Sequence, residues 1–241
     1  MKLITWNCQG AFRKKAEFIL AREPDILVIQ ECEHPNKLIF NSNTERPKDF
    51  LWFGENKNKG LGIFSYSDFT FQLTDNHNTD IKLVAPILVT NGKTDFILFA
   101  IWANNRKDPQ GQYIEQVWKA VNYYEHLLNN KNLILTGDFN SNKIWDKKHR
   151  VGNHSTVVES LLRKEIYSVY HKYFEQKQGE EKNPTFFLQR NLTKPYHIDY
   201  CFASNEMYAK VKNVEVGTFD NWIEYSDHTP LIVDFDLGDE C

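Results

Sequence analysis

The chain has 241 residues, of which 41% are hydrophobic and 25% are charged, so its composition is that of a soluble globular protein. A formal net charge of −3 excludes an overall polycation, although it leaves room for a local basic face. The four cysteines lack zinc-ligand spacing, and no apolar run approaches the roughly 20 residues of a membrane span. We therefore expect one cytoplasmic, monomeric domain over residues 1–241, with no membrane partner.

The first half of the chain opens with a β-α-β pattern. Residues 3–8 predict a buried strand, residues 11–22 a helix that Pro24 ends, and residues 25–30 a second strand with an unbroken apolar centre. Residues 33–49 are polar and predict a loop with some helix. Further strands are predicted at 50–53, 61–66, 69–73, 81–90 and 95–102.

The second half repeats this organisation. Residues 112–128 predict an amphipathic helix, residues 132–136 a strand, and residues 154–162 another helix. A polar loop is predicted at 176–183, and the remaining strands at 185–188, 196–203, 211–217 and 231–235. Two groups of strands with helices at similar points predict an α/β protein in which two packed sheets are flanked by helices.

Polar side chains stand at the ends of several apolar strands or inside them. These side chains are Asn7, Glu31, Asp138, Asn140, Asp199, Asp227 and His228. A rigid sheet can bring such groups to one shared edge. Carboxylates, amides and one histidine gathered there suit a hard divalent metal ion and the chemistry of phosphate esters.

Three of these positions carry the most specific hypotheses. Glu31 follows a buried strand, where a carboxylate is costly without a cation, so it predicts a metal ligand; the alternative is a surface residue beyond the strand end. Asp138 and Asn140 share one face of an extended segment. The carboxylate can orient a water molecule and the amide can donate to a phosphoryl oxygen, although this turn alone would fit a backbone role.

Asp199 lies within an apolar strand and needs a hydrogen-bond donor, for which His228 is the candidate. Asp227 and His228 point to opposite sides of an extended chain, so one can face a metal ion and the other a phosphate. His197 favours a structural role. The remaining histidines favour surface or helix-packing positions: His34, His77, His126, His149, His154 and His171.

Several short segments together resemble the endonuclease/exonuclease/phosphatase superfamily, which includes exonuclease III-like and deoxyribonuclease I-like enzymes. The segments occur in the family's order and span nearly the whole chain. They are residues 5–10, 29–31, 60–65, 137–141, 198–200 and 226–230.

The resemblance implies a four-layered α/β sandwich of two mixed sheets and a Mg²⁺ or Mn²⁺ ion held chiefly by Glu31, with Asn7 and Asp227 nearby. It also implies that Asp138 activates the attacking water and Asn140 binds the scissile phosphate. His228, supported by Asp199, would then bind or protonate the phosphate.

One position departs from the family pattern. Trp102 stands where the family usually has a histidine or tyrosine that contacts the phosphate, and an indole cannot transfer a proton. Trp102 is then a stacking wall, with Asn105, Arg106 or Tyr113 as substitute donors, or metal-bound water protonates the leaving group.

The substrate is left open between three classes. Trp145 and Arg150, with neighbouring lysines, and Phe186 suit the stacking of bases and the binding of phosphates, which favours a nuclease for DNA or RNA. Polar loops without a clear wedge favour a general or single-strand-preferring nuclease over a dedicated abasic-site enzyme. The alternatives are a phosphoesterase for a small molecule or lipid head group, and a binding protein that kept the fold and lost the chemistry.

Overall fold

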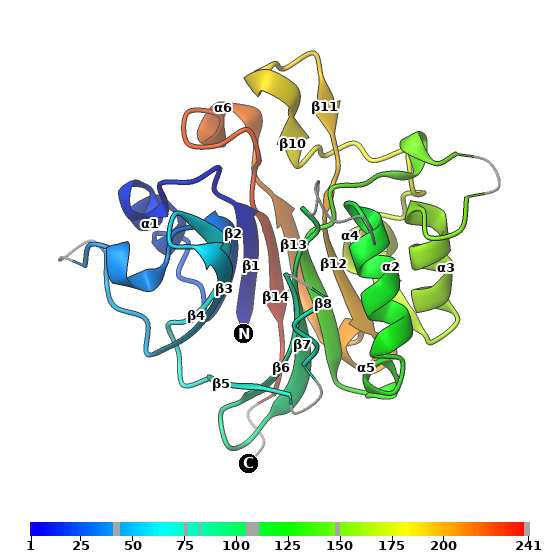
Figure 1. The fold of residues 1–241 in the computed structure, drawn as a ribbon, viewed down its shortest axis with the longest axis horizontal. Helices are drawn as coiled ribbons and strands as arrows, with labels where there is room; N and C mark the ends of the chain where they lie inside the picture. Colours follow the sequence, from blue (N-terminus) through cyan, green and yellow to red (C-terminus); the bar gives the residue numbers. More distant parts are fainter. Residues whose placement is uncertain (41–43, 75–76, 82, 105–110, 148–149, 239–241) are drawn as a thin grey trace.

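The strands form two six-stranded sheets in a computed structural model that describes residues 1–238 except 41–43, 75–76, 82, 105–110 and 148–149. Figure 1 shows the two sheets face to face, with helices on their outer sides. Each sheet mixes parallel and antiparallel pairs. The predicted four-layered α/β sandwich is therefore confirmed.

The first sheet joins the two ends of the chain. Its order is β13-β14-β1-β2-β4-β3, in which β1 runs parallel to β2 and antiparallel to β14. β14, the last strand in the sequence, therefore lies directly beside β1, the first. The strands are β1 (Lys2–Asn7), β2 (Ile26–Cys32), β3 (Asp49–Asn56), β4 (Lys59–Ser65), β13 (Val211–Val216) and β14 (Leu231–Phe235).

The second sheet comes from the middle of the chain. Its order is β5-β6-β7-β8-β12-β9, with β7 parallel to β8 and β12 antiparallel to β8. The strands are β5 (Thr70–Leu73), β6 (Val84–Thr90), β7 (Asp95–Trp102), β8 (Leu133–Asp138), β9 (Ile166–Ser168) and β12 (Asp199–Ser204).

Helices cover the outer faces, α1 on the side of the first sheet and α2 and α3 on the side of the second (Figure 1). A small sheet of β10 (Phe186–Phe187) and β11 (Pro195–Tyr196) projects beside α6 at the top of the view. Among the described helices, none has the length and apolar character to cross a membrane. The helices are α1 (Ala16–Leu20), α2 (Ile114–Tyr123), α3 (His154–Leu162), α4 (Val169–Tyr173), α5 (Asn205–Tyr208) and α6 (Phe219–Trp222).

Strand alternation decides which side chains face the space between the sheets. Leu3 belongs to the core between the sheets, whereas Ile4 and Trp6 pack under the outer helices. Because successive side chains point to opposite faces, Asn7 at the end of β1 points inward like Leu3. The same rule turns Asp138 inward with Ile134 in β8.

Several predicted element bounds were wrong. Residues 11–22 form a 3₁₀ turn (Phe12–Lys14) and the short α1 rather than one helix, because the chain breaks at Lys15, whose ammonium group binds the carbonyl oxygens of Cys8 and Gly10. The predicted strand at 81–90 begins at Val84.

The predicted strands at 185–188 and 196–203 were also wrong in extent. Their first parts pair with each other as β10 and β11, outside the two main sheets, and β12 begins only at Asp199. The sequence analysis did not predict β9 or α4, which are short and depend on tertiary contacts with β12.

Candidate active site

The inward-facing ends of β1, β8 and β12 meet at one edge of the sandwich. Asp138 ends β8 and stands in register with Trp102 on one neighbouring strand and with Asp199 on the other. Gly137 makes this close approach possible, because its φ is +145° and an added Cβ would lie 1.9 Å from the carbonyl oxygen of Ile101. Asp138 and Asp199 are fully buried.

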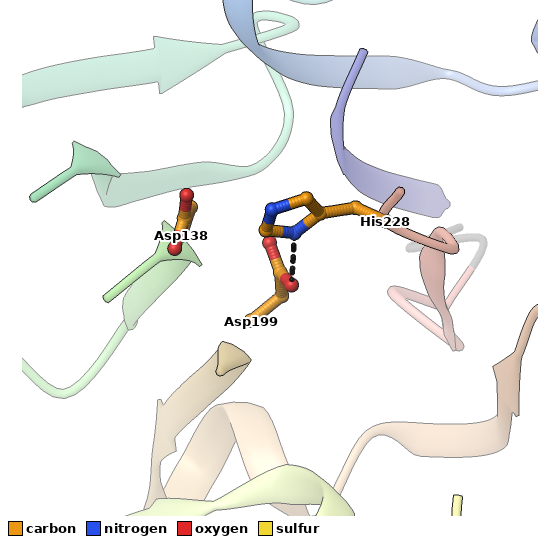
Figure 2. Close-up of side chains that lie close together, drawn as sticks. All are labelled: Asp138, Asp199 and His228. Atoms are coloured by element: carbon orange, nitrogen blue, oxygen red, sulfur yellow. Dashed lines mark hydrogen bonds and ion pairs between the residues drawn. The ribbon is translucent and has the colours of Figure 1, made fainter. Parts of the chain in front are cut away.

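Asp199 and His228 form the predicted pair. His228 Nδ1 lies 2.8 Å from Asp199 Oδ2, and Figure 2 shows both side chains beside Asp138. The predicted contact between Asp199 and His228 is therefore confirmed. The other oxygen of Asp199, Oδ1, is buried without a hydrogen-bond partner among the described residues, which leaves an acceptor aimed into the site.

Two amide side chains donate to Asp138. Asn7 Nδ2 and Asn140 Nδ2 each lie 3.0 Å from Asp138 Oδ2, and the backbone N–H of Asn140 donates to Oδ1 at 2.8 Å. Asn140 holds a left-handed backbone with φ of 48°, which returns its side chain to the carboxylate two residues earlier. Asn7 of the first sheet and Asn140 beyond the second thus both contact Asp138.

Burial and charge set the proton affinities of this cluster. Burial, together with the nearby Asp199 carboxylate, raises the pKa of Asp138 to about 7. Burial alone would lower the pKa of His228, but the charge and hydrogen bond of Asp199 outweigh it and raise this pKa to about 9. Near neutral pH, Asp138 can therefore accept a proton while His228 carries one to donate.

The two ends of the chain fix the position of His228. The indole N–H of Trp6 donates to the carbonyl oxygen of His228 at 3.0 Å. Ser226 Oγ donates to the carbonyl oxygen of Asn7 at 2.7 Å and accepts from the backbone N–H of His228 at 3.0 Å. The sequence analysis gave no role to Trp6 or Ser226, although both stand inside its strand-end motifs.

Glu31 lies within β2 rather than beyond a strand end at residue 30. The pairing of β2 with β4 shifts register between Gln30 and Cys32, and Glu31 has a φ of 57°, so it is a bulged residue. Its carboxylate forms an ion pair with Lys59 of β4. The bulge re-aims the side chain out of the strand pattern, and the sequence carried no signal for this partner.

Asp227 lies near the same carboxylate. Burial raises the pKa of Asp227, and the charge of Glu31 adds to this effect while His228 opposes it. Burial lowers the pKa of the Lys15 ammonium group, and the charges of Asp227 and Glu31 oppose this effect. This side of the site therefore gathers two carboxylates together with neighbouring cations.

Two sets of residues could hold a metal ion. Ligand atoms of Asp138, Asp199 and His228 lie within 4.8 Å of one another. Because Nδ1 of His228 is engaged by Asp199, its Nε2 is the nitrogen left to ligate. Glu31, Asp227 and Asn7 offer oxygen ligands, which hard cations prefer, and the ammonium of Lys59 already stands in for a cation at Glu31. The oxygen set is the better fit to Mg²⁺ or Mn²⁺.

Phe186 lies at the site, whereas Trp102 belongs mostly to the core. The ring of Phe186 lies 4.7 Å from the imidazole of His228, centroid to centroid, and its backbone forms a bridge with that residue. Trp102 is only 4% exposed and packs between the sheets, with its edge on a groove described below. The structure thus places Phe186 more favourably for stacking on a substrate than Trp102.

The other predicted substrate-binding residues border a small pocket of about 190 Å³ beside Asn140. Tyr113, Trp145 and Arg150 line it, and Arg150 forms an ion pair with Glu115. Trp145 is 47% exposed and its ring lies 5.0 Å from that of Tyr196. Asn105, also predicted as a substrate contact, lies outside the described residues.

A second buried polar cluster, here called the histidine network, consists of Asn142, His154, His171, Gln178 and Glu181. His171 Nε2 lies 2.9 Å from Glu181 Oε1, and His154 Nε2 lies 2.9 Å from Gln178 Oε1. Asn142 Nδ2 donates to Glu181 Oε2 at 3.1 Å. The sequence favoured surface or helix-packing positions for His154 and His171, and the structure shows the second of these, with both buried in the helices α3 and α4 and bonded to polar partners.

The histidine network connects the two chain segments that carry the catalytic carboxylates. Asn142 follows Asn140 by two residues, and its Nδ2 also donates to the carbonyl oxygen of His197 at 2.9 Å, two residues before Asp199. His197 Nδ1 lies 2.7 Å from the carbonyl oxygen of Asn183, in keeping with the structural role predicted for it. The network therefore supports the site without entering it.

The sequence matches the Endonuclease/Exonuclease/phosphatase family over residues 4–228. A search of curated protein sequences finds no match. Among solved structures, the chain is similar to the AP endonuclease LMAP from Leishmania major, with 14% identity, a TM-score of 0.71, and coverage of 96% of this chain and 86% of that chain.

Two further solved structures show the same fold. An AP endonuclease from Archaeoglobus fulgidus is 16% identical with a TM-score of 0.64, covering 98% of this chain and 100% of that chain. A 3'-5' exonuclease (NExo) from Neisseria meningitidis is 21% identical with a TM-score of 0.64, covering 98% and 99% respectively. At these identities the likeness shows the fold alone.

Proposed function

Because the chain belongs to the Endonuclease/Exonuclease/phosphatase family, we propose that it is a divalent-metal-dependent phosphodiesterase that hydrolyses nucleic acid. One observation carries this proposal: Asp138 lies beside two amide donors and the Asp199–His228 pair at one edge of both sheets. The pKa of Asp138 there is about 7. We include in the proposal that residues 1–241 act as one catalytic domain and as a cytoplasmic monomer.

The proposed reaction uses these groups in sequence. Ionised Asp138 takes a proton from a water molecule as the oxygen of that water forms the new bond to phosphorus. The amides of Asn7 and Asn140 donate to the phosphoryl oxygens. His228, oriented by Asp199, gives its proton to the leaving oxygen as the old phosphorus–oxygen bond breaks. Glu31, with Asp227 and Asn7, would hold a divalent ion, which would supply charge stabilisation to the transition state.

Two features favour nucleic acid over a small phosphoester. Phe186 offers an aromatic ring beside His228, where a base next to the scissile phosphate can stack. In addition, the similar solved structures are those of AP endonucleases and an exonuclease. If the test below shows cleavage of a small phosphoester alone, a small-molecule phosphoesterase replaces this proposal.

The test is turnover of a panel with Mg²⁺, Mn²⁺ or EDTA. The panel contains single- and double-stranded DNA, an abasic-site duplex, RNA and an inositol phosphate. Metal-dependent cleavage of a nucleic acid supports the proposal and names the substrate. Cleavage of the inositol phosphate alone moves the protein to the small-molecule class, and no cleavage of any member refutes catalysis under these conditions.

Glu31→Gln tests the metal assignment beside the panel. The change removes the ligand charge at constant size, so we expect turnover to fall by about 100-fold or more. Mn²⁺ binding, followed by electron paramagnetic resonance, should weaken in parallel. The matched control is Glu17→Gln, which alters an exposed carboxylate on α1 and should change neither quantity. Undiminished turnover of Glu31→Gln at saturating Mg²⁺ would refute the assignment.

A further inference from the structure

A groove of about 590 Å³ lies at the seam between the two sheets, within the size range of small-molecule sites. One wall comes from the β3–β4 hairpin of the first sheet, and the other from the segment before β6 and the end of β7 in the second. The walls are mostly aromatic and aliphatic. They include Trp52, Phe53, His77, Ile81, Leu83 and Trp102.

Two residues that line the groove are neighbours of the candidate active site. Lys59 lines the groove and forms the ion pair with Glu31, so one end of the groove borders the proposed metal ligand. On the opposite wall, Trp102 stands in register with Asp138, and the next residue, Ala103, donates its backbone N–H to the carbonyl oxygen of Asp138 at 2.8 Å. The proposed metal ligand is therefore bonded to a residue of one wall, and the proposed base stands beside a residue of the other.

The aromatic wall is held in place although it is only half-buried. The indole N–H of Trp52 donates to the carbonyl oxygen of Cys32 at 3.2 Å. Its ring also lies against Gly54 and Gly60, where an added Cβ would come within 2.4 Å of indole atoms. Because successive side chains of β3 point to opposite faces, the fixed Trp52 ring supports the hairpin wall from one side and leaves the half-buried Phe53 ring as the surface for stacking on the other.

The remaining chemistry of the groove fits a planar base. Asn56, Thr79 and Asn104 line it and offer amide and hydroxyl groups that can hydrogen-bond to the edge of a ring. Partial burial lowers the pKa of His77, which favours its neutral form. Lys59 brings a positive charge to the end nearest the site, where a phosphate would lie. This polar rim does not suit an acyl chain, which has no groups for hydrogen bonding.

We propose that the groove binds the nucleobase of the nucleotide whose phosphate is attacked, stacked on Phe53 with Lys59 at its phosphate. This subsite rests on the proposed function and extends it, because it makes cleavage depend on a base beside the scissile bond. Base–aromatic stacking of this kind tolerates different sequences, so it selects nucleotides over base-free phosphodiesters rather than one base over another.

Binding tests the subsite without turnover. Protein labelled with 5-fluorotryptophan is titrated in EDTA with dAMP or with 2-deoxyribose 5-phosphate, and the fluorine signals of Trp52 and Trp102 are assigned with Trp→Phe variants. We expect dAMP to shift the signals of Trp52 and Trp102, and the base-free phosphate to leave them unchanged. Equal responses to both ligands, or shifts only at other tryptophans, would overturn the subsite.

Kinetics supply the second test. Phe53→Leu removes the ring and keeps the apolar volume, and Phe50→Leu is the matched control, because Phe50 is an exposed ring on the same strand outside the groove. With Phe53→Leu we expect KM to rise about tenfold for thymidine 5'-(p-nitrophenyl phosphate) and to stay constant for methyl p-nitrophenyl phosphate. Equal effects on both esters would overturn the proposal.

The two proposals fail in different ways. If the protein hydrolyses neither ester but dAMP still shifts the Trp52 signal, the proposed reaction is refuted and the base subsite stands. If both esters are hydrolysed and no tryptophan of the groove responds to dAMP, the reaction stands and the subsite is refuted.

Discussion

The turn from Asp138 to Asn142 joins two polar clusters, the candidate active site and the histidine network. The pKa of the carboxyl group is raised in the first and lowered in the second. On the active-site side, two carboxylates share one imidazole, and Asp199 Oδ1 has no partner among the described residues. In the histidine network, the single carboxylate of Glu181 receives bonds from His171, Asn142 and the backbone N–H of Gly179. Asp138 and Glu181 each accept three hydrogen bonds, so the clusters differ in the second carboxylate beside Asp138 rather than in the number of donors.

This difference appears in the proton affinities. Burial and a second carboxylate raise the pKa of Asp138 to about 7. Burial alone would raise the pKa of Glu181 too, but its hydrogen-bond donors outweigh burial and lower this pKa to about 2. A buried carboxylate that titrates near neutral pH is poised to exchange protons, and one that stays ionised is poised to hold the chain. Burial by itself therefore does not separate catalytic from structural acids.

The largest effect should come from Asp138→Asn. This change keeps size and burial but removes the group that accepts the proton, so phosphodiester hydrolysis should fall by about 10²–10⁴-fold. Initial rates at saturating metal measure it, and circular dichroism checks that the fold remains. Asp95→Asn, at an exposed position of β7, is the matched control. A loss of only a few-fold would remove Asp138 from the role of base.

The histidine network should respond in stability rather than in rate. Glu181→Ala leaves the donors of His171, Gly179 and Asn142 unpaired in a buried place, so the free energy of unfolding should fall by about 3–5 kcal/mol. Urea unfolding measures this loss, and Glu181→Gln, which keeps a carbonyl acceptor, should lose less. Stability within about 1 kcal/mol of the parent would contradict the structural role of Glu181.

The smallest expected effect is on the pH dependence of the free energy of unfolding, to which Asp138 and His197 contribute in opposite directions. The folded protein keeps the proton of Asp138 to about pH 7, whereas the unfolded chain releases it near 3.8, so this group makes stability fall as pH rises between these values. Burial lowers the pKa of His197 to about 4 from 6.5, so His197 makes stability fall as pH drops through that interval.

Asp138→Asn removes only the first of these opposing effects. The slope of unfolding free energy against pH should therefore become more positive between these limits, by up to about 1.4 kcal/mol per pH unit. Urea unfolding of both proteins at several pH values in this interval measures it. Parallel curves for the two proteins would show that Asp138 ionises in the folded state as it does in the unfolded one.

The sequence predicts the site best where strand alternation decides the outcome. Asn7 and Asp138 end buried strands, so the period of two residues is enough to turn them toward the same space. The pairing of Asp199 with His228 followed from the need of a buried carboxylate for a donor. These inferences need only local pattern and burial.

The rest depends on partners that are remote in sequence. Lys59 reaches Glu31 because a bulge redirects that side chain, and His171 is buried because the loop carrying Gln178 and Glu181 folds over it. Neither partner shares a period or motif with the residue it contacts. The break at Lys15 likewise follows from carbonyl groups that its ammonium binds, which helical spacing cannot reveal.

The position of β14 has a consequence for the order in which the molecule is made. Ser226 bonds to Asn7 across 219 residues, and Trp6 bonds to His228 across 222 residues. At ribosomal speeds of about 5–20 residues per second, β1 waits roughly 10–45 s for the strand that completes its edge. Until then His228 is absent, and Asn7 lacks its neighbour. The candidate site therefore stays incomplete until residues 226–228 have been made and have reached β1.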